Sequence, residues 1–408
     1  MIDEAKFILS GFAKQIPPIV FGPDRVNFII ENMDRLSSDQ KLILHNLANY
    51  ILTVMVDRDA SDIEVGGHGT VGFIWFRIFG NKERVKDLPQ LTTDEASVLI
   101  ASLLNKNQCK NLLENRNVDF SYSINIERDK SSVRFRADCY YDLDSLALNM
   151  RAIKPAIRPL ESLEFHQNAI KVMNHNYMKF GLSLITGITG SGKSATLDSI
   201  IDFHNKFDPA HLVIIASPVE YVHKSGFCLI RHREVGKDVP TFKDGVIQCL
   251  RQDPDIIVIG EMRDPDTILA ALEVTDTGHK VFSTLHTSSA VESIDRIIAE
   301  VNPMEQDRVR NRLADVLVSV VSQKLVPSTD GKRVLAKEVL IVTPSVKAAI
   351  KSNNTSEIYM MINQGGPLGM LTMEQDLLRL FIDRRITKEN ALAYSNNKNR
   401  MLQLMKAI

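Results

Sequence analysis

The sequence predicts an α/β protein whose second half carries a parallel-rich sheet and whose first half is an α+β domain. In the second half, short apolar runs alternate with helical stretches, which is typical of parallel strands buried on both faces. The runs are residues 182–186, 212–216, 256–259 and 281–285. In the first half, alternating apolar and polar residues predict strands at 73–79 and 133–141.

Helical periodicity fills the spaces between these strands. One helix is predicted to start after Ser38, with apolar residues on one face, and a second runs from Thr93 to about Leu113. The tail from Pro344 is predicted to be helical, with a break at residues 365–367, where Gly-Gly-Pro stands.

A proline-rich segment separates the two halves. Pro155 and Pro159 lie too close together for the segment to continue a helix or a central strand. We therefore predict four parts, which are an α+β domain with an N-terminal extension (1–153), a linker (154–162), a domain with the parallel-rich sheet (163–343) and a C-terminal helical segment (344–408).

The charge balance and the apolar runs exclude several classes of protein. Lys and Arg number 49 against 50 Asp and Glu, so we expect no direct nucleic-acid binding. The apolar runs are far shorter than the roughly 18 residues of a membrane-spanning helix. Asp3 and Glu4 stand where a secretory signal would be basic, so we expect a cytoplasmic protein.

The four cysteines are scattered and form no C-x-x-C pair. This spacing predicts reduced, packed thiols, with no zinc site and no disulfide. They are Cys109, Cys139, Cys228 and Cys249.

The segment from Gly187 to Ser194, GITGSGKS, fits the phosphate-binding pattern GxxxxGKS. A predicted strand leads into it and a predicted helix leads out, as this loop requires. We predict that residues 187–195 bind ATP, with glycines turning backbone N–H groups toward the phosphates and Lys193 reaching the β- and γ-phosphates. The Ser194 hydroxyl is the expected Mg²⁺ ligand. The ATP-binding residues are Gly187, Ile188, Thr189, Gly190, Ser191, Gly192, Lys193, Ser194 and Ala195.

Three further polar positions follow predicted strands. Glu261 is a candidate to hold Mg²⁺ through water or to orient the attacking water, although an acid leaving a strand is equally often a solvated or capping residue. His286 could sense the γ-phosphate at the ligand crevice, although a lone histidine is more often a packing residue. Glu220 is a third candidate, with a surface turn as the alternative.

With these motifs in order, the chain resembles the type II/type IV secretion ATPase superfamily, and most of all the PilT-type pilus-retraction ATPases. The resemblance runs from about residue 59 to 391. Its markers are ASDI at 60–63, RFR at 134–136, REVG at 233–236, GEMRD at 260–264, TGH at 277–279, HT at 286–287, VSQKL at 321–325 and GMLTM at 369–373.

This resemblance implies a PAS-like first domain, a RecA-like ATPase domain and a homohexamer. It implies a mechanically coupled ATPase that is associated with the inner membrane through a platform protein of a pilus or secretion machine. By motif position, Glu261 is the Walker B glutamate, Glu220 the catalytic glutamate of the Asp box, and His279 and His286 the His-box residues. Arg136, Arg151 and Arg233 are candidates to reach a nucleotide, with surface ion pairing as the alternative.

The sequence departs from the family pattern at three places. The Asp box usually reads Glu-Asp-Pro-x-Glu, but Ala216 and Ser217 fill its first two places, which puts fast hydrolysis in doubt. Residues 142–145 lack the arginine-rich turn of the family, and residues 346–351 match its retraction-linked helix only in part.

These features leave several functions open. A retraction-type pilus motor is the leading hypothesis, followed by a type IV secretion or conjugative transfer ATPase of the PilT-like branch. A weakly hydrolysing, nucleotide-gated ring and a nucleotide kinase that uses the same loop are the readings from other classes.

Overall fold

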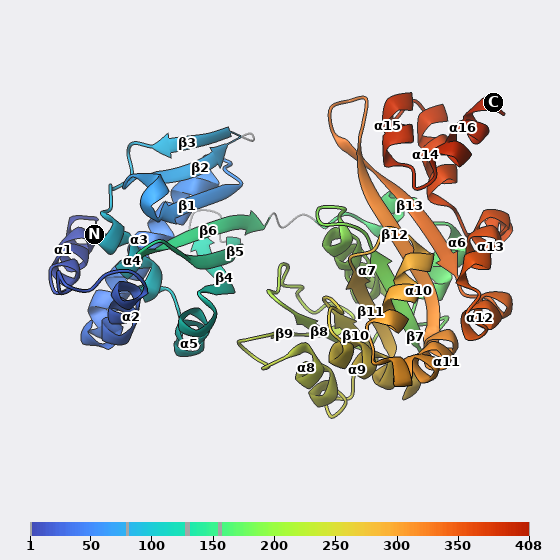
Figure 1. Ribbon diagram of the computed structural model, residues 1–408, viewed down its shortest axis with the longest axis horizontal. Helices are drawn as coiled ribbons and strands as arrows, with labels where there is room; N and C mark the ends of the chain where they lie inside the picture. Colours follow the sequence, from blue (N-terminus) through green and yellow to red (C-terminus); the bar gives the residue numbers. More distant parts are fainter. Residues whose placement is uncertain (1, 79–80, 127–130, 154–156, 408) are drawn as a thin grey trace. The chain divides into compact units, whose positions relative to one another are not determined.

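The computed structural model describes residues 2–78, 81–126, 131–153 and 157–407. The chain divides into two compact units, which we describe separately (Figure 1). One contains residues 1–155 together with 217–221, and the other contains 156–216 and 222–408. The predicted strand at 73–79 ends at Phe79, outside the described residues, and so do residues 154–156 of the predicted linker. The end of that predicted linker overlaps a short 3₁₀ helix, Leu160–Leu163.

The described strands of the first unit form a six-stranded sheet of order β3-β2-β1-β6-β5-β4. Every neighbouring pair is antiparallel. The strands are β1 (Asp62–Gly66), β2 (Ile74–Ile78), β3 (Asn81–Val85), β4 (Asn117–Ile126), β5 (Ser131–Asp142) and β6 (Ser145–Ile153). The α+β class predicted for this half is thus confirmed.

Helices α3 (Ser38–Asp57), α4 (Thr93–Ser102) and α5 (Lys106–Asn115) pack on this sheet. The prediction of a single helix from Thr93 to Leu113 was wrong. The first helix ends at Ser102. A second helix, α5, then starts with a capping box in which the Asn105 side chain accepts a hydrogen bond from the Gln108 backbone N–H.

The N-terminal extension forms two helices, α1 (Ile2–Ala13) and α2 (Pro23–Asn32), which pack against α4. Their buried residues belong to the same hydrophobic core as the sheet. Glu95 in α4 is 4% exposed and accepts hydrogen bonds from Lys6 and Ser10 of α1. The extension is therefore an integral part of the first unit.

The described strands of the second unit form a seven-stranded sheet of order β13-β12-β7-β11-β10-β8-β9. All neighbours are parallel except β12 and β13, which are antiparallel. The strands are β7 (Gly181–Thr186), β8 (His211–Ala216), β9 (Leu229–Glu234), β10 (Ile256–Ile259), β11 (Lys280–Leu285), β12 (Leu317–Pro327) and β13 (Arg333–Ile341). The parallel-rich sheet is confirmed, and the predicted strands begin within one residue of those observed.

Both faces of this sheet are covered by helices (Figure 1). Alternate residues of the central strands join two separate cores, so that Ile257 faces one and Val258 faces the other. One core contains residues of α8 (Phe242–Cys249), α9 (Pro265–Asp276), α10 (Ala290–Ala299) and α11 (Gln306–Val316), and the other contains residues of α6 (Gln167–Met173) and α7 (Lys193–Phe207). The continuous apolar runs of the sequence follow from this two-sided burial.

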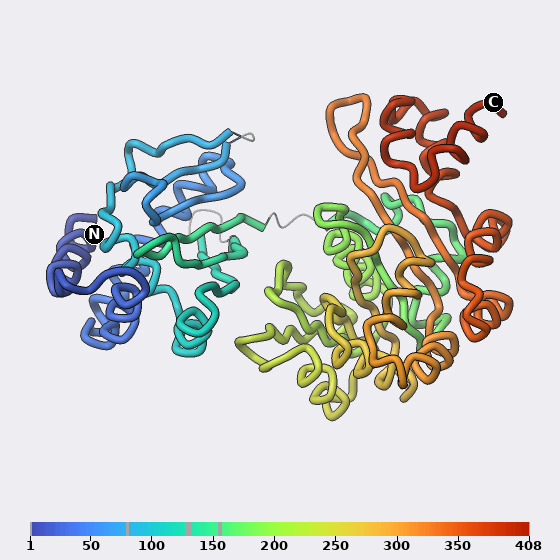
Figure 2. The backbone as a smooth tube through the Cα atoms, viewed as in Figure 1, coloured from blue at the N-terminus to red at the C-terminus, as the bar shows by residue number. Residues whose placement is uncertain are grey.

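The C-terminal part is helical, as predicted, and packs beside the β12–β13 hairpin (Figure 2). Leu371 forms a β-bridge with Val339 at the free edge of β13. The predicted break contains a 3₁₀ helix, Gly366–Leu368. The helices are α12 (Pro344–Lys351), α13 (Ile358–Gln364), α14 (Met373–Ile382), α15 (Lys388–Tyr394) and α16 (Lys398–Lys406).

No helix among the described residues combines the length and the apolar character that crossing a membrane requires.

Candidate functional site

The phosphate-binding motif forms the turn between β7 and α7. Gly187 has a φ of 151°, and a Cβ there would lie 2.3 Å from Ser191 Oγ and 2.5 Å from the Gln323 carbonyl oxygen. No side chain fits at this position. Gly192, at φ 91°, is the N-cap of α7. The loop therefore presents its backbone at the positive end of a helix, which is an anion-binding arrangement.

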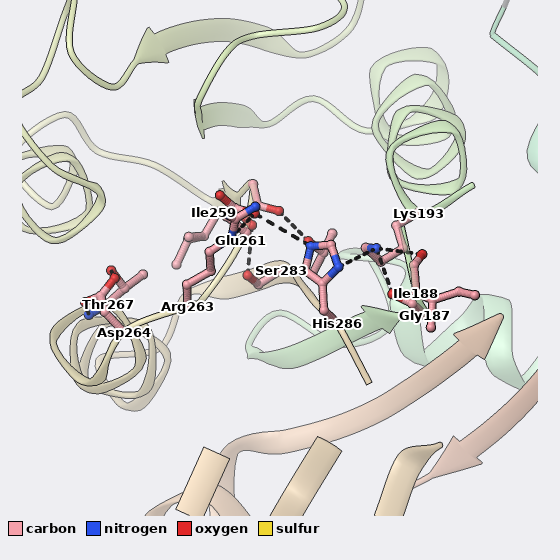
Figure 3. Close-up of polar contacts among 12 residues, drawn as sticks. Gly187, Ile188, Lys193, Ile259, Glu261, Arg263, Asp264, Thr267, Ser283 and His286 are labelled. Atoms are coloured by element: carbon pink, nitrogen blue, oxygen red, sulfur yellow. Dashed lines mark hydrogen bonds and ion pairs between the residues drawn. The ribbon is translucent and has the colours of Figure 1, made fainter. Parts of the chain in front are cut away.

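Lys193, the first residue of α7, is 9% exposed and lies inside the loop. Its Nζ donates hydrogen bonds to the carbonyl oxygens of Gly187 at 2.8 Å and Ile188 at 3.2 Å (Figure 3). The loop thus holds a positive charge beside the N-terminus of its own helix.

His286 lies between Lys193 and Glu261 (Figure 3). Its Nδ1 is 3.5 Å from Lys193 Nζ, and its Nε2 is 3.9 Å from Glu261 Oε2. The three residues follow β7, β11 and β10, which are neighbouring parallel strands, so their carboxyl ends meet at one edge of the sheet. The structure therefore brings together three of the residues predicted from the sequence.

The electrostatics of this edge favour a neutral imidazole. Burial lowers the pKa of His286, and the positive charges of Lys193, Arg263 and Arg296 lower it further. Because its pKa lies below the ordinary range of histidine, the His286 imidazole is uncharged at neutral pH. A neutral imidazole can accept a proton or hydrogen bond at one nitrogen and donate at the other.

Hydrogen bonds between strand ends fix the positions of Glu261 and His286. The Thr284 hydroxyl donates to the Gly260 carbonyl at 2.6 Å, and the Ser283 hydroxyl donates to the Ile259 carbonyl at 2.8 Å. The carboxylate of Glu261 is thus set at a fixed place relative to β11.

Three residues of the site were missed by the sequence reasoning. Arg263 Nε lies 2.8 Å from Glu261 Oε2, Arg296 donates to the His286 carbonyl at 3.0 Å, and Gln323 donates to the Ser191 carbonyl at 3.0 Å. Arg263 and Gln323 stand within the GEMRD and VSQKL markers, so those motifs held the signal. No pattern in the sequence points to Arg296.

The residues at this edge fit a magnesium ion. Ser194 is exposed in the first turn of α7, and its hydroxyl and the Glu261 carboxylate supply hard oxygen ligands. Mg²⁺ keeps most of its waters and needs only one or two protein oxygens, and the described residues contain no cluster of three or more His, Cys, Asp or Glu for a metal.

His279 lies away from this edge. It precedes β11, whereas His286 follows it, so the two histidines stand at opposite ends of the strand. His279 Nδ1 is 3.0 Å from the Thr277 hydroxyl and 3.1 Å from the Val274 carbonyl oxygen. Its place in the site of this subunit is therefore not supported by the geometry.

Glu220 follows β8 and is half-buried, in the segment 217–221 whose contacts group it with the first unit. Arg233, on β9, donates to Gln248 Oε1 at 2.8 Å. Its role and that of Glu220 stay predictions.

Arg136 and Arg151 are cross-strand neighbours in the sheet of the first unit. Arg151 Nε donates to Asp62 Oδ1 at 2.7 Å, and Arg136 Nε lies 3.9 Å from Asp119. Both arginines make ion pairs within the first unit, which is the surface ion pairing given above as the alternative to nucleotide contact. The Arg151 side chain is nevertheless 70% exposed.

Comparison with known proteins gives relatives over most of the chain. The twitching motility protein of Neisseria gonorrhoeae is 36% identical over 326 residues, covering 80% of this chain and 85% of the relative. The type IV pilus retraction ATPase PilT of Pseudomonas aeruginosa is 36% identical over 315 residues, covering 77% of this chain and 89% of the relative.

Solved structures show the same likeness. The pilus retraction motor PilT with bound ADP has a TM-score of 0.76 at 34% identity, covering 87% of this chain and 98% of that one. The Legionella pneumophila ATPase DotB has a TM-score of 0.74 at 26% identity, covering 90% of this chain and 96% of that one. The family model for type II/IV secretion system proteins matches residues 37–376. This chain therefore belongs to the type II/IV secretion system protein family.

Proposed function

We propose that this chain is an ATP-hydrolysing motor subunit that powers a type IV pilus of the retraction type or a related secretion machine. The observation that carries the proposal is the alignment of Lys193, His286 and Glu261 along one sheet edge, where distances of 3.5 Å and 3.9 Å link them. An ammonium that pairs with phosphate and a carboxylate that can hold Mg²⁺ or orient water are groups that phosphoryl transfer uses. A neutral imidazole beside them can form a hydrogen bond with the γ-phosphate. The names of the PilT relatives support the pilus assignment.

Each group has a distinct part in the proposed reaction. Residues 187–195 hold the phosphates of ATP, and Lys193 pairs with the β- and γ-phosphates. Ser194 and, through water, Glu261 hold Mg²⁺, which offsets phosphate charge when bound. His286 senses the γ-phosphate, and Glu220 orients or deprotonates the attacking water.

Residues of the first unit complete the proposal. We assign to Arg136 and Arg151 of this unit, and to Arg233 on β9 of the second unit, the task of offsetting charge on the transferred phosphoryl group, some of them from a neighbouring subunit. Assembly as a homohexamer would supply that neighbour. ATP hydrolysis drives motions of the domains, and these motions are passed to an inner-membrane platform protein. The chain would then act at the cytoplasmic face of that membrane.

Two other functions have specific support. The family description includes secretion systems, which favours a type IV secretion or conjugative transfer ATPase of the PilT-like branch. Ala216 and Ser217, in the altered Asp box, favour a ring that binds ATP but hydrolyses it weakly. Pilin and platform genes beside the gene of this chain, or transfer genes in their place, would separate pilus from transfer use.

The test is the ATPase rate of the purified chain beside Glu261→Gln, with ATP affinity measured for both. The amide keeps the shape of the carboxylate but cannot act as a base or as a charged partner of Mg²⁺. We expect ATP affinity within about threefold and a turnover number lower by on the order of 100-fold. Equal turnover in the two proteins would contradict the motor, and no turnover in either would favour the nucleotide-gated ring.

A further inference from the structure

A buried carboxylate lies between the start of α10 and the start of α14. Glu338, on β13, is 2% exposed, and its Oε1 accepts a hydrogen bond of 2.8 Å from the backbone N–H of Ala290. The backbone N–H of Met373 also faces this carboxylate and lowers its pKa. Ala290 and Met373 are the first residues of α10 and α14. One side chain therefore binds the N-termini of two helices, where negative charge is stabilised.

Helix α10 is directly connected to the candidate active site. It starts four residues after His286, and its Arg296 donates to the His286 carbonyl at 3.0 Å. Thr287, the next residue, pairs with Ser293 of α10 at 2.6 Å. The position of α10 thus sets the position of His286.

Helix α14 is in turn connected to the other C-terminal helices. Glu374, in its first turn, is fully buried. Its carboxylate accepts hydrogen bonds from the Tyr359 hydroxyl of α13 at 3.2 Å and from the backbone N–H of Asn397, the N-cap of α16, at 2.8 Å.

A second connection runs in parallel with the first. Asn396 Nδ2 donates to the Ser288 carbonyl at 3.3 Å, and Lys324 Nζ donates to Asn396 Oδ1 at 2.6 Å. The segment that follows His286 is therefore attached to the C-terminal helices at Ser288 as well as at Ala290.

We propose that Glu338 is a positioning residue that couples the His286 loop to helices α14–α16, so that the state of the nucleotide is transmitted to the C-terminal segment. The inference rests on the proposed function, because it assigns a route out of the same site. An uncharged or shorter side chain at position 338 would uncouple the start of α10 from the start of α14, because no other side chain among the described residues is shown to bind both helix starts.

The test is hydrogen exchange of the full chain with ADP and with a non-hydrolysable ATP analogue. In the wild type, we expect exchange at α10 and at α14–α16 to differ between the two nucleotides. In Glu338→Gln, the difference should persist at α10 and shrink markedly at α14–α16, where the hydrogen bond from Asn396 to Ser288 remains. ATP turnover should fall about tenfold, within the range of couplings carried by hydrogen-bonded networks, while nucleotide affinity stays within about twofold.

The matched control is Asp376→Asn. Asp376 is also fully buried, and it joins α14 to β13 by accepting the backbone N–H of Lys337 at 2.9 Å, but it has no contact with α10 among the described residues. This variant should keep the exchange difference at α14–α16. Glu338→Asp keeps the charge but shortens the side chain, and it replaces the glutamine variant if that variant does not fold. The exchange difference between the two nucleotides at α14–α16 should shrink in this variant as well.

The dependence of ATP turnover on pH gives a further measurement, which a purely structural role of Glu338 would leave unchanged. Burial, together with the nearby Glu374, raises the pKa of Glu338 to about 7, against the opposing effects of Lys324 and the two backbone N–H groups. The ionised form binds both helix starts best, so wild-type turnover should fall as the pH decreases through 7, and this step should be absent from Glu338→Gln. Glu292 of α10 and Glu374 also act on Lys324 and belong to the same charged cluster.

The outcomes separate the inference from the proposed function. A wild type that binds neither nucleotide would overturn the proposed function. Nucleotide binding with an exchange difference at α14–α16 that keeps its wild-type size in Glu338→Gln, or that shrinks equally in Asp376→Asn, would overturn the inference alone.

Discussion

Lys193 is the residue on which nucleotide binding should depend most strongly. Its ammonium lies within the phosphate loop, held by two carbonyl oxygens. Carbonyls leave the charge unneutralised, so a phosphate oxygen is a better partner than the groups that now hold it.

We predict that Lys193→Ala lowers ATP turnover by at least about 100-fold, because the phosphates lose the ammonium that pairs with them. Steady-state ATP hydrolysis and binding of a fluorescent nucleotide check the prediction. Lys206, exposed near the end of the same helix, is the control, and its change to Ala should leave turnover within about twofold. Wild-type turnover in Lys193→Ala would refute the site.

His286 should give the pH profile of turnover an acid limb. Its pKa lies below the ordinary value of 6.5, so the imidazole is neutral at pH 7 and gains a proton as the pH falls. A protonated ring would face Lys193 and Arg263 with like charge, so turnover should decrease as the pH falls below the ordinary range of histidine.

We predict that His286→Asn lowers the turnover number by on the order of 100-fold, changes nucleotide affinity less, and removes this acid limb. Turnover and affinity measured from pH 5.5 to about 8 check both effects. An unchanged turnover number would make His286 a packing residue.

That three residues of the proposed site lie together could be predicted from the sequence for a physical reason. Glu261 and His286 lie within two residues of the end of a buried strand, Lys193 starts the helix after the phosphate loop, and parallel strands bring such positions to one edge. Arg296 and Glu338 have side-chain contacts that are set by tertiary packing, which no local pattern encodes. Gln323 stands in the VSQKL marker, but its contact with the phosphate loop also depends on that packing. His279 precedes the same strand that His286 follows, so closeness in the sequence does not bring it to this edge, and its role stays a prediction.

Among the elements, the buried strands were the most predictable and the helix boundaries the least. Strands β7, β10 and β11 are buried along their whole length, so each appears in the sequence as a short, mostly apolar run. The boundary between α4 and α5 is marked by a capping asparagine, Asn105, which starts α5. The spacing of apolar residues through this segment does not reveal the boundary. The extension before residue 37 has no match in the family model, and its helices could be placed only by their packing.

At this scale we predict that Leu9→Ala in α1 destabilises the first unit by about 2 to 5 kcal/mol, the cost of a cavity in a packed core. Leu9 is fully buried, whereas Phe7, on the same helix, is 80% exposed, so Phe7→Ala should cost less than about 0.5 kcal/mol. Denaturant unfolding followed by tryptophan fluorescence measures this unit specifically, because the single tryptophan of the chain, Trp75, lies in β2. Equal losses in the two variants would show that the extension does not contribute to the core.

For the whole molecule, the fold class could be predicted and the assembly could not. Hydrophobic patterning determines which faces are buried within one chain, so it predicts the layers of each unit. Contacts between subunits involve surfaces that are mixed in composition and carry no such pattern.

We predict that the purified chain has a mass six times the 45.8 kDa of one subunit when light scattering is measured with Mg²⁺ and an ATP analogue. The proposed arginine contacts from a neighbouring subunit require this assembly. A monomer that binds nucleotide and turns it over would contradict the ring and would favour the kinase alternative.

The central position of β7 has a consequence for the making of this protein. Its neighbour β12 starts at Leu317, and Gln323, which supports the phosphate loop, lies 132 residues after Ser191 in the chain. A ribosome adding roughly 5 to 20 residues per second therefore completes β7 many seconds before that partner exists. Until then β7 is an open strand edge in the nascent chain, so the nucleotide site should be among the last parts to form and should need protection from mispairing during synthesis.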